Sequence, residues 1–104
     1  MSFELKYAHD LEPADARARL VALGEYLSNK HGLTVSWSND TEAKVSGKFL
    51  VVSIEGTLRL SGKSAEFTGK DPGMLWRGKA RDYLLGKLKT YLDPATPLQA
   101  LPRR

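Results

Sequence analysis

The feature that most constrains the fold is the alternation of side chains in residues 49–61, FLVVSIEGTLRLS. An apolar row at every second position is typical of a β-strand that buries one face. The row consists of Leu50, Val52, Ile54, Gly56, Leu58 and Leu60. We therefore predict one long strand over residues 49–61, bent or bulged at its glycine, that spans roughly 43 Å at ~3.3 Å per residue.

The turns that join this strand to its neighbours follow from the pairing rule for hairpins. In a two-residue loop, residues i and i+3 face each other and lie on the same face of the sheet. Turns at residues 47–48 and 62–63 satisfy this rule with apolar pairs on one face. A three-residue loop at residues 38–40 joins the strand that ends at Trp37 to the strand that follows it. The predicted pairs are Val45 with Leu50, Ala43 with Val52, Leu60 with Ala65, Leu58 with Phe67, Trp37 with Thr41 and Val35 with Ala43.

The other elements are a short first strand and two amphipathic helices. Residues 3–7 alternate as a strand does, and the next segment has Pro13 suited to the first helical position and Gly32 suited to a left-handed C-cap. The predicted core face of this helix is Ala16, Leu20, Leu23 and Leu27, and the opposite face is Asp15, Ala18, Ala22, Glu25 and Asn29. A second helix is predicted from about residue 74 to residue 92. Its apolar arc is Trp76, Ala80, Tyr83, Leu84, Leu88, Tyr91 and Leu92.

These elements define an α+β fold in the order β-α-β-β-β-β-α. We expect an antiparallel β-meander sheet with both helices packed on one face. Residues 1–93 are predicted to form a single domain. Residues 94–104 contain three prolines without periodicity, and we expect them to form a mobile C-terminal tail.

The composition limits the chemistry available to the chain. Its 104 residues suffice for one core, and the absence of cysteine excludes disulfides and thiol catalysis. No apolar run approaches the ~20 residues of a membrane-spanning helix, and no signal peptide is visible. The net charge of +4 permits an anionic partner but fits a solvated surface of mixed charge equally well.

No residue pattern predicts a catalytic site, a cofactor site or a metal site. Residues 73–80 have the GxxxxGK spacing of a phosphate loop, but Ala80 stands where a Mg²⁺-binding hydroxyl is required. The alternative is a helix start with Trp76 in the core. His9 beside Asp10 could act as a general base or be an ordinary junction residue, and His31 complements a helix dipole.

Two surfaces are candidates for contact with partners. On the open face of the sheet Phe49 and Val51 place apolar side chains where solvent is expected, and together with Ser53 they form the candidate partner surface. The second helix carries the basic residues Arg77, Arg81, Lys87 and Lys89. Of these, Lys87 falls inside the apolar arc. It either extends to the sheet edge or a carboxylate, or it points into a groove toward a ligand.

The order of several short motifs resembles a known family. His9, Leu11 and Pro13 precede an Ala/Arg-rich helix, and a strand ending in Trp37 follows. Further matches are a KVSGK turn at residues 44–48, a Gly-Thr-Leu strand at 56–58 and a Gly-Lys helix start at 78–79. Over residues 3–93 the chain is similar to the small bacterial proteins of the polyhydroxyalkanoic acid system. A longer strand near residues 49–55 and the Pro-rich tail depart from that pattern.

The resemblance implies a bacterial cytoplasmic accessory protein at the polyester storage granule, and it supplies no catalytic residues. We therefore hypothesise a non-enzymatic binding protein that acts through the open sheet face or an apolar groove, with a second copy, a protein or the granule surface as its partner. One alternative is weak binding of nucleic acid or another anionic surface through the basic second helix. Another is a carrier with an apolar cavity between sheet and helices, which requires a pocket of at least ~300 Å³.

Overall fold

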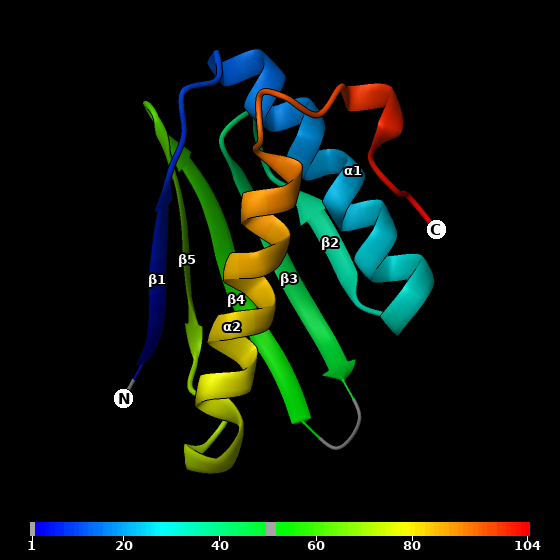
Figure 1. Cartoon of the computed structure of the whole chain (residues 1–104). Helices are drawn as coiled ribbons and strands as arrows, with labels where there is room; N and C mark the ends of the chain where they lie inside the picture. Colours follow the sequence, from blue (N-terminus) through cyan, green and yellow to red (C-terminus); the bar gives the residue numbers. More distant parts are fainter. Residues whose placement is uncertain (1, 50–51) are drawn as a thin grey trace.

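The computed structural model describes residues 2–49 and 52–104. Within these residues, five strands form one antiparallel sheet in the order β1-β5-β4-β3-β2, and α1 and α2 cover one face of it (Figure 1). The predicted fold class and element order are confirmed. The elements are β1 Ser2–Ala8, α1 Pro13–His31, β2 Thr34–Trp37, β3 Glu42–Phe49, β4 Val52–Ser61, β5 Ser64–Lys70, α2 Met74–Tyr91 and the short 3-10 helix η1 Leu98–Ala100.

The first strand lies at one edge of the sheet, and the sequence alone had left its position open. It pairs antiparallel with β5, so that Leu5 lies opposite Phe67. β2 forms the other edge. Because α1 connects these two edge strands, it must cross the face of the sheet, and α2 packs on the same face (Figure 1).

The hairpin after β4 has the predicted register, whereas the one before β4 does not. Leu60 faces Ala65 and Leu58 faces Phe67, as the turn at residues 62–63 requires. The predicted turn at residues 47–48 is wrong, because β3 continues to Phe49, which pairs with Val52. Residues 49–61 are therefore not one strand. Ala43 faces Leu58, six residues from the predicted partner, and a shift by an even number leaves every apolar side chain on the same face.

The loop between β2 and β3 is also longer than predicted. Trp37 pairs with Ala43 and Val35 with Val45, two residues beyond the predicted partners. The side-chain oxygen of Asn39 accepts a hydrogen bond from the backbone N–H of Thr41 at 2.9 Å, which stabilises the longer loop. Here again the even shift keeps the apolar face unchanged, so polarity alone could not distinguish the two registers.

Gly56 lies within an uninterrupted ladder, without the inserted residue of a bulge. It pairs with Val45 on one side and with Gly69 on the other. A Cβ atom at this position would lie 2.5 Å from the Phe67 ring and 2.9 Å from the carbonyl oxygen of Thr68. The glycine is thus required by the ring and the backbone that lie against it, and the predicted bulge is absent.

The tail packs against α1 on the face that was predicted to be exposed. Leu101 is 4% exposed and belongs to the same core as Ala22, which is fully buried. The Arg103 guanidinium lies 2.9 Å from the Glu25 carboxylate, and its carbonyl accepts a hydrogen bond from Asn29. Ala22, on the face opposite the predicted core face of α1, is therefore also part of the core. The division into a domain of residues 1–93 and a tail of residues 94–104 remains a prediction.

Candidate binding cavity

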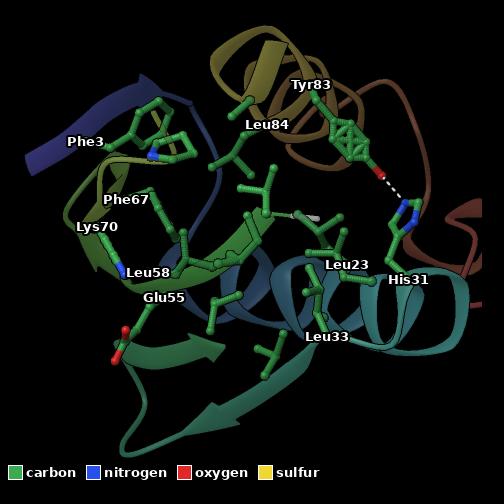
Figure 2. A pocket seen from close by; sticks show the side chains of 18 of the residues that line it. Phe3, Leu23, His31, Leu33, Glu55, Leu58, Phe67, Lys70, Tyr83 and Leu84 are labelled. Carbon is green, nitrogen blue, oxygen red and sulfur yellow. Dashed lines mark hydrogen bonds between the residues drawn. The ribbon is translucent and has the colours of Figure 1, made fainter. Parts of the chain in front are cut away.

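An apolar cavity of about 420 Å³ lies between the sheet, α1 and the first half of α2 (Figure 2). Its wall consists of side chains from each of the five strands and from one face of each helix. The residues that form most of this wall are Phe3, Leu20, Leu23, Leu27, Leu33, Val35, Val45, Val52, Ile54, Leu58, Phe67, Trp76, Ala80 and Leu84. Such a volume meets the size that an apolar-ligand carrier requires.

The cavity exists because the two halves of α2 pack differently. Leu88 and Tyr91, in the second half, are 0% and 1% exposed. Trp76, Ala80 and Leu84, in the first half, are only partly buried and border the cavity. The predicted apolar arc is therefore correct as a pattern, but only its C-terminal part is sealed by the core.

Arg19 fixes the C-terminal end of α2 to α1. This side chain is 5% exposed, and its Nη1 atom donates hydrogen bonds to the carbonyl oxygens of Tyr91, at 3.2 Å, and Asp93, at 2.9 Å. Its Nε atom lies 2.9 Å from the carboxylate of Asp15. The last carbonyls of a helix lack partners within the helix, and here a buried guanidinium supplies one.

A polar cluster closes the cavity where the end of α1 meets the middle of α2. The Nε2 atom of His31 lies 2.9 Å from the hydroxyl oxygen of Tyr83, and both residues line the cavity (Figure 2). Burial, followed by the charges of Lys30 and Lys87, lowers the pKa of His31 below its ordinary value. The His31 ring is thereby favoured in its neutral form.

Lys87 lies over aromatic rings in this cluster. Its Nζ atom is 4.4 Å from the centre of the Tyr26 ring and 5.5 Å from that of Tyr83. Lys87 was predicted to extend to the sheet edge or a carboxylate, or to point into a groove toward a ligand. The structure shows instead a cation–π contact that joins the two helices. Sequence reasoning did not identify this contact or the His31–Tyr83 pair. The position of Lys87 inside the apolar arc was the one signal that pointed there.

The phosphate-loop spacing of residues 73–80 does not produce a phosphate loop. Gly73 is the N-cap of α2, with φ of 104°, and its carbonyl accepts hydrogen bonds from the amides of Trp76 and Arg77. Arg77 is paired with Asp71 at 2.6 Å. Residues 74–80 therefore belong to the helix α2 and not to a loop that could wrap a phosphate, and Trp76 lines the cavity instead.

His9 is buried in a structural position. It is 7% exposed, and its Nδ1 atom accepts a hydrogen bond from the backbone N–H of Leu11 at 3.1 Å. Burial of the ring lowers its pKa first, the charge of Lys63 lowers it further, and Asp10 opposes both. This arrangement links the end of β1 to the start of α1.

The structure separates the predicted basic surface into different contacts. Arg77 binds Asp71, and Arg81 donates to the carbonyl of Glu4 at 3.0 Å and lies over the Phe3 ring. Lys87 faces α1, and Lys89 is exposed. These four residues therefore make different contacts, and their role as a basic binding surface remains a prediction.

The predicted sheet-face surface is only partly described. Ser53 is exposed. Val51 lies outside the described residues, as does the side chain of Phe49. A role for Phe49 and Val51 in partner contact remains a prediction.

No group of three or more metal-ligating side chains occurs among residues 2–49 and 52–104. Within the same ranges, neither helix is long and apolar enough to cross a bilayer. The fold and the cavity thus define a small α+β protein with an apolar pocket between its sheet and its helices.

Residues 3–95 match the model of one family, described as putative polyhydroxyalkanoic acid system protein, and the chain belongs to that family. The predicted family is confirmed, and the match ends near the start of the tail. No curated protein and no solved structure matched the chain.

Proposed function

We propose that this protein is a non-enzymatic accessory protein of the polyester storage system that holds an apolar chain in the cavity beside α2. The observation that carries the proposal is the cavity of about 420 Å³, whose wall is formed almost entirely by apolar side chains. Membership of the polyhydroxyalkanoic acid system family supports a setting at the storage granule, in the bacterial cytoplasm.

The size of the cavity indicates the length of chain that it would accept. One water occupies roughly 30 Å³ of the liquid, and a methylene group is of similar size, so the volume of about 420 Å³ has room for about fourteen methylenes at most. Each buried methylene contributes about 0.8 kcal/mol. A chain of intermediate length would therefore bind without any further interaction at its head.

The start of α2 offers a route for such a chain to reach the cavity. Met74 and Leu75 are each 85% exposed, and they lie in sequence between the lining residues Pro72 and Trp76. Two adjacent exposed apolar residues are suited to contact with an apolar surface. We propose that they touch the granule surface and that the chain passes between α2 and the sheet.

The absence of a catalytic step is part of the proposal. Of the two histidines, His9 accepts a backbone hydrogen bond and His31 is bonded to Tyr83. Both imidazoles thus serve contacts within the fold, which supports a binding role over general base chemistry.

Calorimetric titration with a series of 1-alkanols tests the proposal. Affinity should rise about fourfold per added methylene and level off when the cavity is full. Ala80→Trp places an indole in the cavity and should abolish binding. Thr90→Trp, on the exposed side of the same helix, should bind as the unmodified protein does.

Failure of every alkanol to bind, or equal affinities with Ala80→Trp and Thr90→Trp, would contradict the cavity as the binding site. Granule contact is tested separately by sedimentation with purified polyester granules. Met74→Ser combined with Leu75→Ser should reduce the bound fraction, while Phe49→Ser with Val51→Ser should not. The reverse result would assign granule contact to the sheet face.

A further inference from the structure

The few polar and basic residues of the mainly apolar cavity wall include His31, Lys79 and Tyr83, and their positions indicate what kind of ligand the cavity takes. Lys79, Tyr83 and Lys87 are spaced four residues apart on α2, and residues with this spacing lie along one stripe of a helix. Lys79 and Tyr83 both line the cavity, and the Nζ atom of Lys87 is 5.5 Å from the centre of the Tyr83 ring. Lys87 therefore lies against the tyrosine, and Lys79 lies one turn before it on the same stripe of α2.

These charges are not neutralised by neighbouring carboxylates. Within the described part of the chain, no Asp or Glu oxygen lies within 4.0 Å of the Nζ atom of Lys79 or Lys87. Instead, each ammonium lies over an aromatic ring, Lys79 over Trp76 and Lys87 over Tyr26. A cation over a ring keeps its capacity to attract an anion.

A third lysine strengthens the positive field at this end. The charges of Lys30 and Lys87 both act on His31, whose pKa they lower after the larger effect of burial. The acidic side chains nearest in sequence to this region are Glu25, which is paired with Arg103, and Asp82, which is exposed on α2 and makes no ion pair among the described residues. An anion placed beside Tyr83 and His31 would thus meet lysines on α1 and α2.

The other end of the cavity carries charges of both signs. Figure 2 shows Glu55 and Lys70 close to one another on the side of the cavity away from Tyr83 and His31. Glu55 precedes Gly56 on β4 and Lys70 follows Gly69 on β5, and these two glycines are paired in the sheet. Because a carboxylate and an ammonium are neighbours there, the excess of positive charge belongs to the Tyr83 end.

We infer that the cavity takes a single-chain amphiphile with an anionic head group, which Lys79 and Lys87 hold at the Tyr83 end. This inference rests on the proposed function and adds the chemical class of the ligand. A carboxylate and a phosphate share the required chemistry, so a free acid and a phosphorylated lipid are both sources of such a head group. The apolar chain would extend from Tyr83 toward Val52 and Ile54, which line the same cavity.

Titration with three ligands of one chain length tests the inference, namely decanoate, decyl phosphate and decanol below their aggregation concentrations. At least one anion should bind about tenfold tighter than decanol, the advantage expected of a charge-assisted contact. A larger advantage for decanoate indicates a free acid, and a larger advantage for decyl phosphate indicates a phosphorylated lipid. Lys79→Gln with Lys87→Gln should remove the advantage of the anion over decanol.

Lys89→Gln is the matched control, because Lys89 is an exposed lysine on the same helix. It should retain the preference for the anion, and about 0.5 M salt should reduce that preference in the unmodified protein. Decanol binding with no anion preference would overturn the inference and leave the proposed function standing. Absence of binding by all three ligands would overturn both.

Discussion

The Nη1 atom of Arg19 on α1 lies 2.9 Å from the carbonyl oxygen of Asp93, just beyond α2. The same atom donates to the carbonyl of Tyr91. One buried guanidinium thus holds the C-terminal end of α2 against α1, while the first half of α2 borders the cavity. The cavity depends on this difference between the fixed C-terminal half of α2 and its less buried N-terminal half.

Replacing Arg19 should therefore destabilise the fold strongly. Arg19→Met keeps the apolar part of the side chain but leaves two carbonyl oxygens without their donor, at a cost of about 2–3 kcal/mol. Urea denaturation measures the loss. Arg59→Met is the control, since Arg59 is an exposed residue paired with Glu42 on the far face of the sheet, and it should have a much smaller effect. Equal effects would contradict the role of Arg19.

Alanine at the glycines within α2 should stabilise the protein. A Cβ atom at Gly78 or Gly86 would meet no other heavy atom within 4 Å. Glycine in a helix interior costs about 1 kcal/mol relative to alanine. Gly78→Ala and Gly86→Ala should each raise the free energy of unfolding by about that amount, measured by urea denaturation. A loss of stability would indicate that α2 is not helical at these positions.

Alanine at the paired glycines of the sheet should have the opposite effect. A Cβ atom at Gly69 would lie 2.4 Å from the carbonyl oxygen of Glu55, and one at Gly56 would lie 2.5 Å from the Phe67 ring. Overpacking of this kind costs about 1–3 kcal/mol. Gly56→Ala and Gly69→Ala should lower the midpoint of thermal unfolding. Unchanged midpoints would contradict the register of β4 and β5.

Stability should decrease as the pH falls below about 6.5. The pKa values of His9 and His31 are both lowered in the fold, chiefly by burial, whereas in the unfolded chain a histidine takes up its proton near pH 6.5. Between these values the unfolded state binds more protons, so protonation favours unfolding. The stabilisation is fully present above about pH 6.5 and is lost as the pH falls through the lowered pKa values.

Urea denaturation at about pH 7.5 and about pH 5.5 measures this dependence. His9→Asn combined with His31→Asn should reduce it, because neither replacement titrates. A double variant with the same pH dependence as the unmodified protein would assign the effect to other groups.

The sequence predicted the faces of the elements better than their partners. Alternation placed Val52, Ile54 and Leu58 on the core face, and the structure agrees. The hairpin register before β4 was wrong because a shift by six residues conserves the apolar face, so Ala43 fits Leu58 as well as Val52. The turn at residues 62–63 was predictable because its two-residue loop and its apolar pairs agree on one register.

An apolar cavity between sheet and helices was one hypothesis from the sequence, but its position beside the first half of α2 could not be predicted from the same patterns. The apolar arc of α2 reads alike at Trp76 and at Leu88, yet the first is partly exposed and the second fully buried. We attribute that difference to the hydrogen bonds of Arg19 and to the path of α1 across the sheet. Both join residues that are distant in the sequence. The His31–Tyr83 pair spans 52 residues and has no local signal.

The central claim is that an apolar chain occupies the space between the sheet and α2. Methyl-resolved NMR during titration with decanol tests it most directly. The account predicts saturable shifts at 1:1 stoichiometry for the methyl groups of Leu23, Ile54 and Leu84, and for the indole of Trp76. Shifts confined to the exposed residues Met74 and Leu75, or no shifts at all, would contradict it.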